Sequence, residues 1–382
     1  RVRAMSSAAA FRRQLVHELA IADARVRDAF LRVPRELFVP EFHAEHGLAA
    51  VYRDEVVVTK TDEHGIAISS SSQPRIMAAM LERLELEPGQ RVLEVGAGTG
   101  YNAALLKTVV GPRGRVVSVD VDAEIVRAAR RALRLGGYSV RVVCGDGRDG
   151  FPAAAPFDRI VVTASSADVP RAWLEQLREG GLLELPLRLS STGVQAVAAF
   201  RRRGERLEST AVIPGGFMPL RGEGLEDARP FSLVAAEVGG KPLLQLTGSS
   251  LAALSGAGRR RVLALALGEP RRTPLGCLPT WPLGFHLSLE LPQSRLVVRF
   301  GPPGIGVVGR GGRSLALVEG RLEQGDRPSP QRLAAWGEPE AEQVLRRAVE
   351  RWRERGRPAE AELRLAISFD GGASRITRRW TR

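Results

Sequence analysis

Cysteine is scarce in this chain of 382 residues, which contains only Cys144 and Cys277. Two cysteines cannot form a disulfide framework, and a closed zinc site usually needs four Cys or His ligands. We therefore expect free thiols in a reducing compartment. No metal site is expected either, because metal-ligand spacing is missing among the histidines. These are His17, His43, His46, His64 and His286.

Long apolar segments are also missing. No run approaches the roughly 18 to 20 apolar residues of a membrane-spanning helix, and residues 1–20 lack the apolar centre of a signal peptide. Hydrophobic residues nevertheless make up 44% of the chain and charged residues 26%, which is enough to bury one or two ordinary cores. These features predict a soluble, cytoplasmic, globular protein with no membrane partner.

Lysine is almost absent, since only Lys60, Lys107 and Lys241 occur, so the net charge of +13 comes almost wholly from arginine. Residues 1–200 carry 26 basic and 24 acidic side chains, whereas residues 201–382 carry 30 and 19. The excess lies mainly in the second half, but because it is almost wholly arginine we favour a solvated arginine-rich surface over a dedicated site for a polyanion. Nucleic acid is therefore not the favoured partner.

Residues 76–200 alternate short β-branched runs with helical stretches, within a core domain expected over residues 76–225. This alternation is typical of an α/β fold with a doubly wound parallel sheet. Residues 1–75 precede this core as N-terminal helices followed by a polar loop. Within the core, strands are expected at Arg91–Val95, Arg115–Val119, Val140–Val143, Arg159–Thr163 and Leu182–Leu189, with helices from Tyr101, over Ala123–Leu135 and near Arg171–Leu177.

The alternation is lost in residues 226–382, which predict a second, β-rich α+β domain. One strong helix is expected there, because Pro339 suits a first turn and Gly356 lies just past an apolar face that includes Trp352. Strands are expected at Phe231–Val238, Val262–Leu267, Phe285–Leu291, Leu296–Phe300, Ser314–Val318 and Leu363–Phe369.

The most informative segment is a buried strand that runs into glycines, Val92–Gly100. Glycines at the carboxyl edge of such a sheet let the backbone approach a cofactor closely. The spacing is G-x-G-x-G, which differs from the dinucleotide pattern G-x-G-x-x-G. Taken alone, such a turn is as compatible with a tight strand-to-helix connection as with a cofactor site.

Two acidic residues follow the next two strands. Asp120 lies 20 residues beyond Gly100 at a strand end, where a carboxylate can accept hydrogen bonds from both ribose hydroxyls. Asp146 follows the third strand, beside the expected place of an adenine. Each acid could instead cap a helix or a turn. A glycine turn and two acids at successive strand ends are harder to explain by structure alone.

This pattern resembles the class I S-adenosylmethionine-dependent methyltransferases. A nucleic-acid amino-methyltransferase would usually show Asn or Asp followed by Pro-Pro and an aromatic residue after the fourth strand. Here Val161–Ser166 has no such motif. The resemblance implies S-adenosyl-L-methionine as the cofactor.

Further motifs are similar to the protein-L-isoaspartate O-methyltransferase family. They occur in order over about residues 30–190, where their sequence and spacing make the resemblance specific. The motifs are Val33-Pro34-Arg35-Glu36-Leu37-Phe38-Val39-Pro40, Tyr52-Arg53-Asp54, Ser69-Ser70-Ser71-Ser72-Gln73-Pro74, Gly145-Asp146-Gly147 and Pro156-Phe157-Asp158-Arg159-Ile160-Val161-Val162-Thr163-Ala164.

The family resemblance implies methylation of isoaspartyl or aspartyl carboxylates in proteins or peptides, after which the ester collapses to a succinimide or aspartimide. It places Ser72 at the catalytic site. The alternative for the serine run is a polar turn that caps the following helix. The cofactor-binding residues that the resemblance implies are Ser69, Ser70, Ser71, Ser72, Glu94, Gly96, Ala97, Gly98, Thr99, Gly100, Asp120, Val121, Asp146 and Gly147.

The chain departs from the family pattern in length and in its loop. About half of the sequence follows the catalytic core, and Thr59–Gly65 is more polar than the corresponding loop of a usual repair enzyme. The serine run and Pro214–Gly222 resemble an actinobacterial-type branch, some members of which methylate aspartate in ribosomally made modified peptides such as lanthipeptides and graspetides. Both repair of isoaspartate and tailoring of a peptide aspartate therefore stay open.

A carboxylate has a pKa near 4, so it is already a nucleophile at neutral pH and needs no general base. Catalysis should then depend mainly on positioning two bound reactants in a site that excludes water. Ser72 is expected to orient the carboxylate, with Thr59, Lys60 and Arg221 as weaker candidates at the substrate side. Two other readings are a nucleic-acid methyltransferase and a non-catalytic S-adenosylmethionine-binding module.

Overall fold

The computed structural model describes residues 2–63, 65–222, 232–238, 241–300, 303–320 and 328–381. His64, Phe231 and the boundary expected between residues 225 and 226 lie outside the described residues. The chain divides into two units. The first contains residues 1–187, 197–225 and 364–378, and the second contains residues 188–196, 226–363 and 379–382.

The first unit begins with helices that pack onto its sheet. Asp23 caps the second helix, since its carboxylate accepts hydrogen bonds from the backbone N–H groups of Arg25 and Val26 at 2.8 and 3.1 Å. Pro40 occupies the first turn of the third, where its missing N–H costs nothing. These elements are α1 (Val2–Leu19), α2 (Ala24–Arg32), the 3-10 helix η1 (Arg35–Phe38) and α3 (Pro40–Val51).

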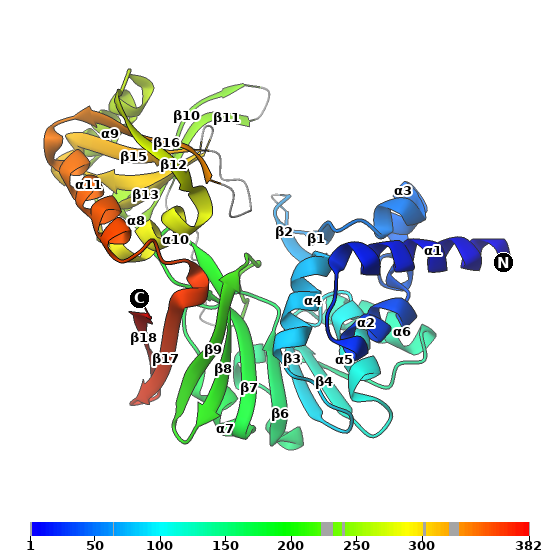
Figure 1. Cartoon of the computed structure of the whole chain (residues 1–382). Coiled ribbons are helices and arrows are strands. Elements are labelled where there is room, and N and C mark those ends of the chain that lie inside the picture. The colour runs from blue at the N-terminus through cyan, green and yellow to red at the C-terminus, as the bar shows by residue number, and fades with distance from the viewer. Residues whose placement is uncertain are drawn as a thin grey trace. The chain divides into compact units, whose positions relative to one another are not determined.

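A nine-stranded sheet forms the centre of the first unit (Figure 1). Its strand order is β18-β17-β9-β8-β7-β6-β3-β4-β5, and the pairs among β3, β4, β5, β6 and β7 are parallel. The strands are β3 (Arg91–Val95), β4 (Arg115–Asp120), β5 (Arg141–Cys144), β6 (Phe157–Val162), β7 (Leu177–Arg188), β8 (Gln195–Arg203), β9 (Arg206–Pro214), β17 (Leu363–Asp370) and β18 (Ala373–Trp380).

Helices connect the parallel strands, as the alternating pattern predicts, so the doubly wound α/β core is confirmed. Apolar side chains of the N-terminal helices, α4, α5 and α6 share one core cluster with Val92, Val116 and Val142 of the sheet. A separate antiparallel hairpin precedes α4. The remaining elements of this unit are β1 (Val57–Thr61), β2 (Ala67–Ser71), α4 (Pro74–Arg83), α5 (Tyr101–Val110), α6 (Ala123–Leu135), η2 (Gly147–Asp149), η3 (Pro152–Ala154) and α7 (Arg171–Gln176).

The C-terminal hairpin belongs to the sheet of the first unit. β17 pairs antiparallel with β9, with Ala366 opposite Glu208 and Ile367 opposite Leu207. The sequence-based boundary at residue 226 assigned residues 363–382 to the second domain, whereas residues 364–378 lie in the first unit. A hairpin's local pattern specifies that it is a strand pair, but it does not specify which distant strand it joins.

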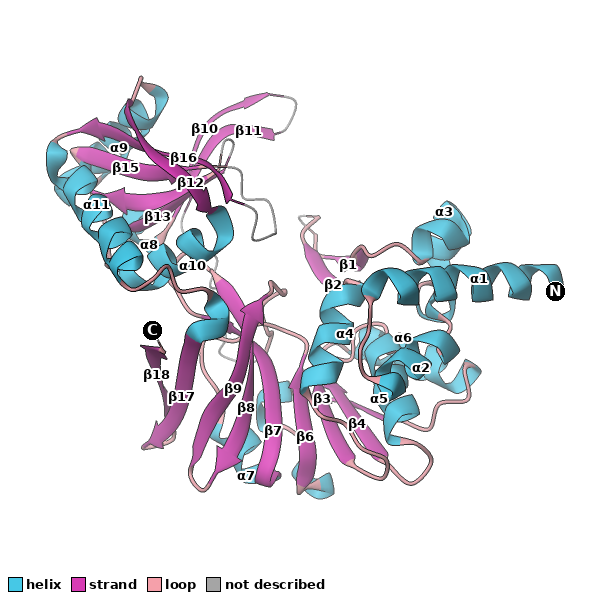
Figure 2. Ribbon diagram, in the orientation of Figure 1, coloured by secondary structure: helices cyan, strands magenta, loops and turns pink. Residues whose placement is uncertain are grey.

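The second unit contains a seven-stranded sheet with strand order β10-β11-β13-β14-β15-β16-β12 (Figure 2). The expected helix is α11, which begins at Pro339 and buries Leu345, Val349 and Trp352. The elements are β10 (Ser232–Val238), β11 (Lys241–Thr247), α8 (Ser249–Ala252), α9 (Gly256–Leu267), β12 (Arg271–Pro279), α10 (Thr280–Glu290), β13 (Leu296–Phe300), β14 (Gly304–Val308), η4 (Arg310–Gly312), β15 (Ser314–Glu319), β16 (Pro328–Gly337), α11 (Pro339–Glu354) and η5 (Glu360–Glu362).

Two strand predictions in this unit are wrong. Val262–Leu267 lies in α9, which Ser255 caps by accepting a hydrogen bond from Gly258 N–H at 3.2 Å. Phe285–Leu291 coincides with α10 and the residue after it, where both the apolar residues and the intervening His286 and Ser288 are buried. Because α10 is buried on most of its surface, it lacks a clear amphipathic period, and its apolar run has the pattern of a buried strand.

None of the helices in the described part of the chain combines the length and apolar character needed to cross a membrane.

Candidate active site

The glycine turn connects β3 to α5 at the carboxyl edge of the parallel strands. Gly96, Gly98 and Gly100 have φ values of +96°, +49° and +85°, in the left-handed region that glycine adopts without strain. A Cβ atom on Gly96 would lie 2.4 Å from Thr163 Oγ1, so a side chain cannot be accommodated there. Ala97 is buried, and Thr99 Oγ1 accepts a hydrogen bond from the N–H of Tyr101 at 3.4 Å.

Asp120 lies beside this turn, as the sequence predicts. Its Oδ2 accepts a hydrogen bond from Gly98 N–H at 3.2 Å, and its Oδ1 accepts one from Asp122 N–H at 3.1 Å. Each carboxylate oxygen has a second lone pair, which leaves acceptor capacity for two ligand hydroxyls. Val121 follows with 39% of its surface exposed, and its carbonyl accepts a weak hydrogen bond from Cys144 Sγ.

Glu94 lies beneath the turn with no exposed surface. Its carboxylate accepts hydrogen bonds from Asn102 Nδ2 at 2.8 Å and from the Ser118 hydroxyl. Burial raises the pKa of Glu94 to about 7, although these two hydrogen bonds act in the opposite direction. In this position Glu94 joins β3, β4 and α5 and so holds the turn from behind.

Asp146 and Gly147 follow β5 and open η2. Asp146 Oδ1 accepts a hydrogen bond from Arg148 N–H at 2.8 Å. Gly147 packs so closely on β3 that a Cβ atom would lie 2.4 Å from Val95 Cγ1. The segment after β9 returns to this place, because a Cβ atom on Gly222 would lie 2.5 Å from Asp146 Oδ2.

The serine run connects the β1–β2 hairpin to α4. Ser70 contributes a carbonyl oxygen 3.3 Å from the Cβ position of Gly98, so the hairpin lies against the glycine turn. Ser69 is buried, and its hydroxyl accepts a hydrogen bond from Thr59 Oγ1 at 3.2 Å. Ser71 is also buried, and within the described residues its hydroxyl has no hydrogen-bond partner.

Ser72 is half-buried at the end of this run. The residue that caps α4 is Gln73, which makes no side-chain capping bond. The alternative in which the serines cap this helix is therefore wrong. Gln73 Nε2 instead donates hydrogen bonds to the carbonyl and carboxylate oxygens of Asp54 at 3.0 and 3.3 Å, which fixes the course of the chain around Ser72.

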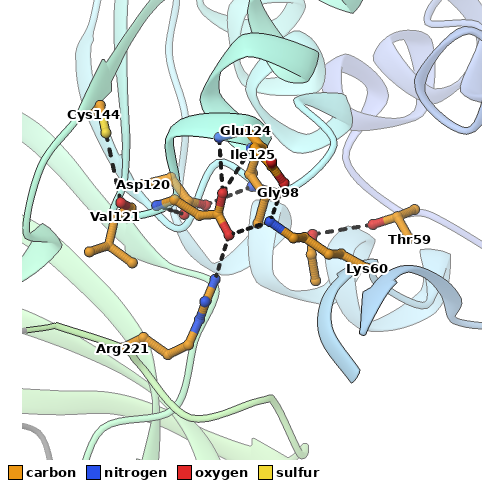
Figure 3. A network of polar contacts seen from close by, with 11 residues as sticks. Thr59, Lys60, Gly98, Asp120, Val121, Glu124, Ile125, Cys144 and Arg221 are labelled. Atoms are coloured by element: carbon orange, nitrogen blue, oxygen red, sulfur yellow. Dashed lines mark hydrogen bonds and ion pairs between the residues drawn. The ribbon is translucent and has the colours of Figure 1, made fainter. Parts of the chain in front are cut away.

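An ion-pair network connects the hairpin to the start of α6 (Figure 3). Lys60 Nζ lies 2.8 Å from Asp122 Oδ2 and 2.7 Å from Glu124 Oε2, and Arg221 Nη2 lies 3.8 Å from the same Asp122 oxygen. Burial alone would raise the pKa of Asp122, but hydrogen bonds from Lys60 and from the backbone at Ile125 lower it below its usual value. Lys60 and Arg221 thus contact the segment that carries Asp120, two residues away.

The structure therefore brings the predicted residues together from four elements. Gly98 contacts the hairpin through Ser70 and contacts β4 through Asp120, while Gly147 packs against the end of β3. A glycine cradle with a partly unused carboxylate, together with the unpartnered Ser71 hydroxyl, suits an adenosyl donor that carries ribose hydroxyls. In the described ranges, no group of three or more His, Cys, Asp or Glu side chains is placed to hold a metal ion.

Sequence reasoning missed four residues that support the site. Asn102 and Ser118 hold Glu94, and Asp122 receives Lys60. The position of Asp122 directly before a strongly amphipathic helix was a usable signal, since Asp is a preferred helix cap. Arg35 is the fourth, and its place in the mainly apolar motif Val33-Pro34-Arg35-Glu36-Leu37-Phe38-Val39-Pro40 was a signal that its charge could be buried and need partners.

The parallel sheet, its glycine turn and the acids at successive strand ends define a class I S-adenosylmethionine-dependent methyltransferase. The model of the family described as "Protein-L-isoaspartate(D-aspartate) O-methyltransferase (PCMT)" matches residues 6–224, more than half of the chain. The chain therefore belongs to the protein-L-isoaspartate O-methyltransferase family. The family resemblance, the enzyme class and the methyl donor expected from the sequence are confirmed.

Individual relatives agree with this assignment. A protein-L-isoaspartate O-methyltransferase of Methylorubrum populi is 44% identical over 207 residues, 53% of this chain and 90% of the relative. One of Thermotoga maritima is 40% identical over 198 residues, 50% of this chain but only 61% of the relative's length. A solved structure titled protein-L-isoaspartate O-methyltransferase has a TM-score of 0.55 and 28% identity, and its alignment covers 96% of this chain and 99% of that one.

Proposed function

We propose that this protein transfers a methyl group from S-adenosyl-L-methionine to the free carboxylate of isoaspartyl residues in proteins and peptides. The observation that carries the proposal is the closeness of Ser70 and Asp120 to Gly98, because the glycine turn, which we take as the donor cradle, then lies beside the loop that ends in Ser72. Attack of the neighbouring backbone nitrogen on the new ester then releases methanol and closes a succinimide.

The donor supplies an electrophilic methyl group when bound. We assign the glycine turn, with Ala97 and Thr99, as the surface on which the donor lies. Asp120 and Val121 would bind the ribose of the donor, and Asp146 and Gly147 would lie beside its adenine. The serine run would cover the donor on the side of the β1–β2 hairpin. Glu94 would act through the turn, since it has no exposed surface.

Ser72 is the proposed catalytic residue. Its hydroxyl can donate a hydrogen bond to the substrate carboxylate, which needs orientation but no deprotonation at neutral pH. Orientation of two bound reactants can supply much of the rate enhancement. The bond network of Gln73 and Asp54 supports this role, because it holds the backbone on the exit side of Ser72.

Isoaspartate is favoured over a dedicated peptide aspartate as the substrate. The family model ends at residue 224, so the second unit could have indicated a specialised tailoring enzyme. However, the solved structure with the isoaspartyl title is covered over 99% of its length while covering 96% of this chain. An extra C-terminal unit is therefore compatible with isoaspartyl methylation, and we propose that residues 226–363 recognise protein substrates, acidic ones in particular. A cytoplasmic location also stays a prediction.

The experiment that tests the function is methyl transfer from labelled donor to a short isoaspartyl peptide, with the aspartyl twin as control. We expect turnover of the isoaspartyl peptide only. Turnover of neither peptide, despite measurable donor binding, would contradict the proposal and favour a dedicated aspartyl precursor. Turnover of the aspartyl twin at an equal rate would also contradict it.

Ser72→Ala tests the assigned residue. Loss of one hydrogen bond to a charged group costs about 1.5–3 kcal/mol, so kcat/KM for the isoaspartyl peptide should fall about 10- to 100-fold. Donor affinity, measured by calorimetry, should change less than about twofold. Ser139→Ala, which changes an exposed serine outside the serine run, is the control and should leave both quantities unchanged. A Ser72→Ala enzyme with unchanged turnover would remove Ser72 from the mechanism.

A further inference from the structure

Arg35 lies in the 3-10 helix η1, and its charged side chain is completely buried, with 0% of its surface exposed. Burying a charge is costly unless hydrogen bonds replace the lost water. Burial lowers the pKa of Arg35 below its ordinary value, but arginine remains charged at neutral pH. The motif that carries Arg35 has so far received no role in the proposed function.

The hydrogen bonds of the guanidinium converge on one region of the fold. Nη1 donates to the carbonyl oxygens of Val51 and Arg53 at 2.8 and 3.0 Å. Nη2 donates to the carbonyl oxygens of Glu55 at 2.9 Å and Ser72 at 3.2 Å. Thus one side chain bonds four backbone carbonyls, three between the end of α3 and the start of β1 and one directly after β2.

The neighbouring contacts hold Arg35 itself in place. The Tyr52 hydroxyl accepts a hydrogen bond from Arg35 N–H at 3.2 Å and donates one to a carboxylate oxygen of Glu36. The bonds between Gln73 and Asp54 close the same region on its outer side. The two ends of the hairpin are therefore fixed to one another through the planar guanidinium group of Arg35, whose several N–H donors a lysine ammonium cannot reproduce in the same geometry.

We propose that Arg35 is a positioning residue for methyl transfer, which sets the place of Ser72 by clamping both ends of the β1–β2 hairpin. The inference rests on the proposed function of Ser72. A displacement of about 1 Å in a positioning group can cost about 100-fold in rate, so a buried clamp directly on the Ser72 carbonyl has leverage over catalysis. The glycine turn is held independently of this clamp, by Glu94 and Asp120, so loss of the clamp should affect methyl transfer more than donor affinity.

Arg159 provides a matched control in the same unit. It is also buried, and its guanidinium also bonds backbone carbonyls, those of Leu84, Glu85 and Asp158. Leu84 and Glu85 directly follow the C-terminal end of α4, and Asp158 lies in β6, so all three acceptors are away from the serine run at the start of α4. Arg159→Met and Arg35→Met therefore remove the same type of clamp from two different places.

The test compares Arg35→Met, Arg35→Lys and Arg159→Met with the full-length wild type, each at a temperature where it is folded. We expect both Arg35 variants to lose about 30- to 100-fold in kcat on the isoaspartyl peptide, with donor affinity changed less than about threefold. Arg159→Met should lose thermal stability but keep kcat within about threefold. An Arg35→Lys enzyme that is folded and has wild-type kcat would overturn the proposal, as would an equal loss of kcat in Arg159→Met.

A second readout is independent of the substrate. Hydrogen exchange of the donor-free enzyme should be faster in Arg35→Met at residues 52–55 and 69–73, and unchanged there in Arg159→Met. If the wild type does not methylate the isoaspartyl peptide, the proposed function fails while this exchange pattern still decides whether Arg35 clamps the hairpin. Unchanged exchange in a folded Arg35→Met enzyme would overturn the clamp.

Discussion

A single buried carboxyl, Glu94, supports the glycine turn of the proposed donor site. It occurs on β3 in register with Ser118 of β4, so parallel pairing alone brings its partner to the same face of the sheet. The sequence motif located Glu94 but could not show whether it faced the donor or the core. That depends on which face of the strand α5 covers, which is a tertiary property.

Glu94 should make the first unit less stable as pH rises. Its pKa is raised from about 4.5 to about 7, so the folded state holds the proton more tightly than the unfolded state. This contribution is fully present below pH 4.5 and is lost as pH rises through 7, by up to about 3 kcal/mol. Glu94→Gln keeps a polar partner for Asn102 and Ser118 without titrating. In urea unfolding at pH 5 and pH 8, the variant should lose less stability than the wild type between the two values. Equal losses would show that Glu94 does not titrate in this range.

At the scale of elements, the β1–β2 hairpin is the part that the sequence described least well. Its serines were recognised from a motif, but its contacts with Gly98, α6 and Arg35 join residues 16 to 64 positions apart. Periodicity describes only local structure, so pairings of this kind cannot be read from it. By contrast, the strands and helices of the parallel core were predicted well, because buried β-branched runs and amphipathic helices carry strong local signals.

Lys60→Met should loosen the hairpin from α6. Lys60 is partly exposed, and exposed ion pairs contribute about 0–1 kcal/mol, so donor affinity should fall by up to about fivefold. Salt screens such pairs, so the donor affinity of the wild type should also fall more steeply between 50 and 500 mM salt than that of the variant. Calorimetric titration with the donor measures both. Arg32→Met, which removes the exposed Arg32–Asp28 pair of α2, is the control. Identical salt responses of Lys60→Met and the wild type would contradict the role of Lys60.

The C-terminal strand β17 should stabilise the first unit. Leu365 and Ile367 are almost completely buried in it, and removing such a side chain usually costs about 2–5 kcal/mol. Ile367→Ala should therefore lower the unfolding temperature of the transition that shifts when the donor is added, since ligand binding marks the unit that holds the site. Leu135→Ala, at a 72% exposed position of α6, should leave that transition unchanged. If Ile367→Ala changes the temperature only of an unfolding transition that does not shift with the donor, β17 does not stabilise the first unit.

At the scale of the whole molecule, each unit buries a titrating group, and the two groups should contribute to the pH dependence of stability with opposite signs. His286 of α10 is buried, and neither ring nitrogen has a hydrogen-bond partner among the described residues. Burial lowers the pKa of His286 to about 4, below its ordinary value of about 6.5. Its contribution to stability is therefore present above pH 6.5 and lost as pH falls toward 4. Glu94 has the opposite sign in the other unit.

His286→Leu tests this second response. The leucine fills a similar buried volume without a titrating group, so the second unit of the variant should lose less stability between pH 7 and pH 5 than that of the wild type. In calorimetry, the unfolding transition that does not shift when the donor is added reports on the second unit. His43→Leu, which changes a partly exposed histidine of α3, should leave that transition's pH response unchanged. An equal acid response of His286→Leu and the wild type would show that His286 does not titrate over this range.

The return of residues 364–378 to the first unit bears on the order of events during synthesis. The second unit is an insertion between β9 and β17, and its own residues 226–363 leave the ribosome before the last strand pair of the first sheet does. Until that pair arrives, β9 presents an unpaired edge, a recognised site of wrong strand pairing in partly folded chains. A nascent chain stalled before residue 363 should thus bind the donor yet associate with other chains through β9. Release of the full chain should end that association.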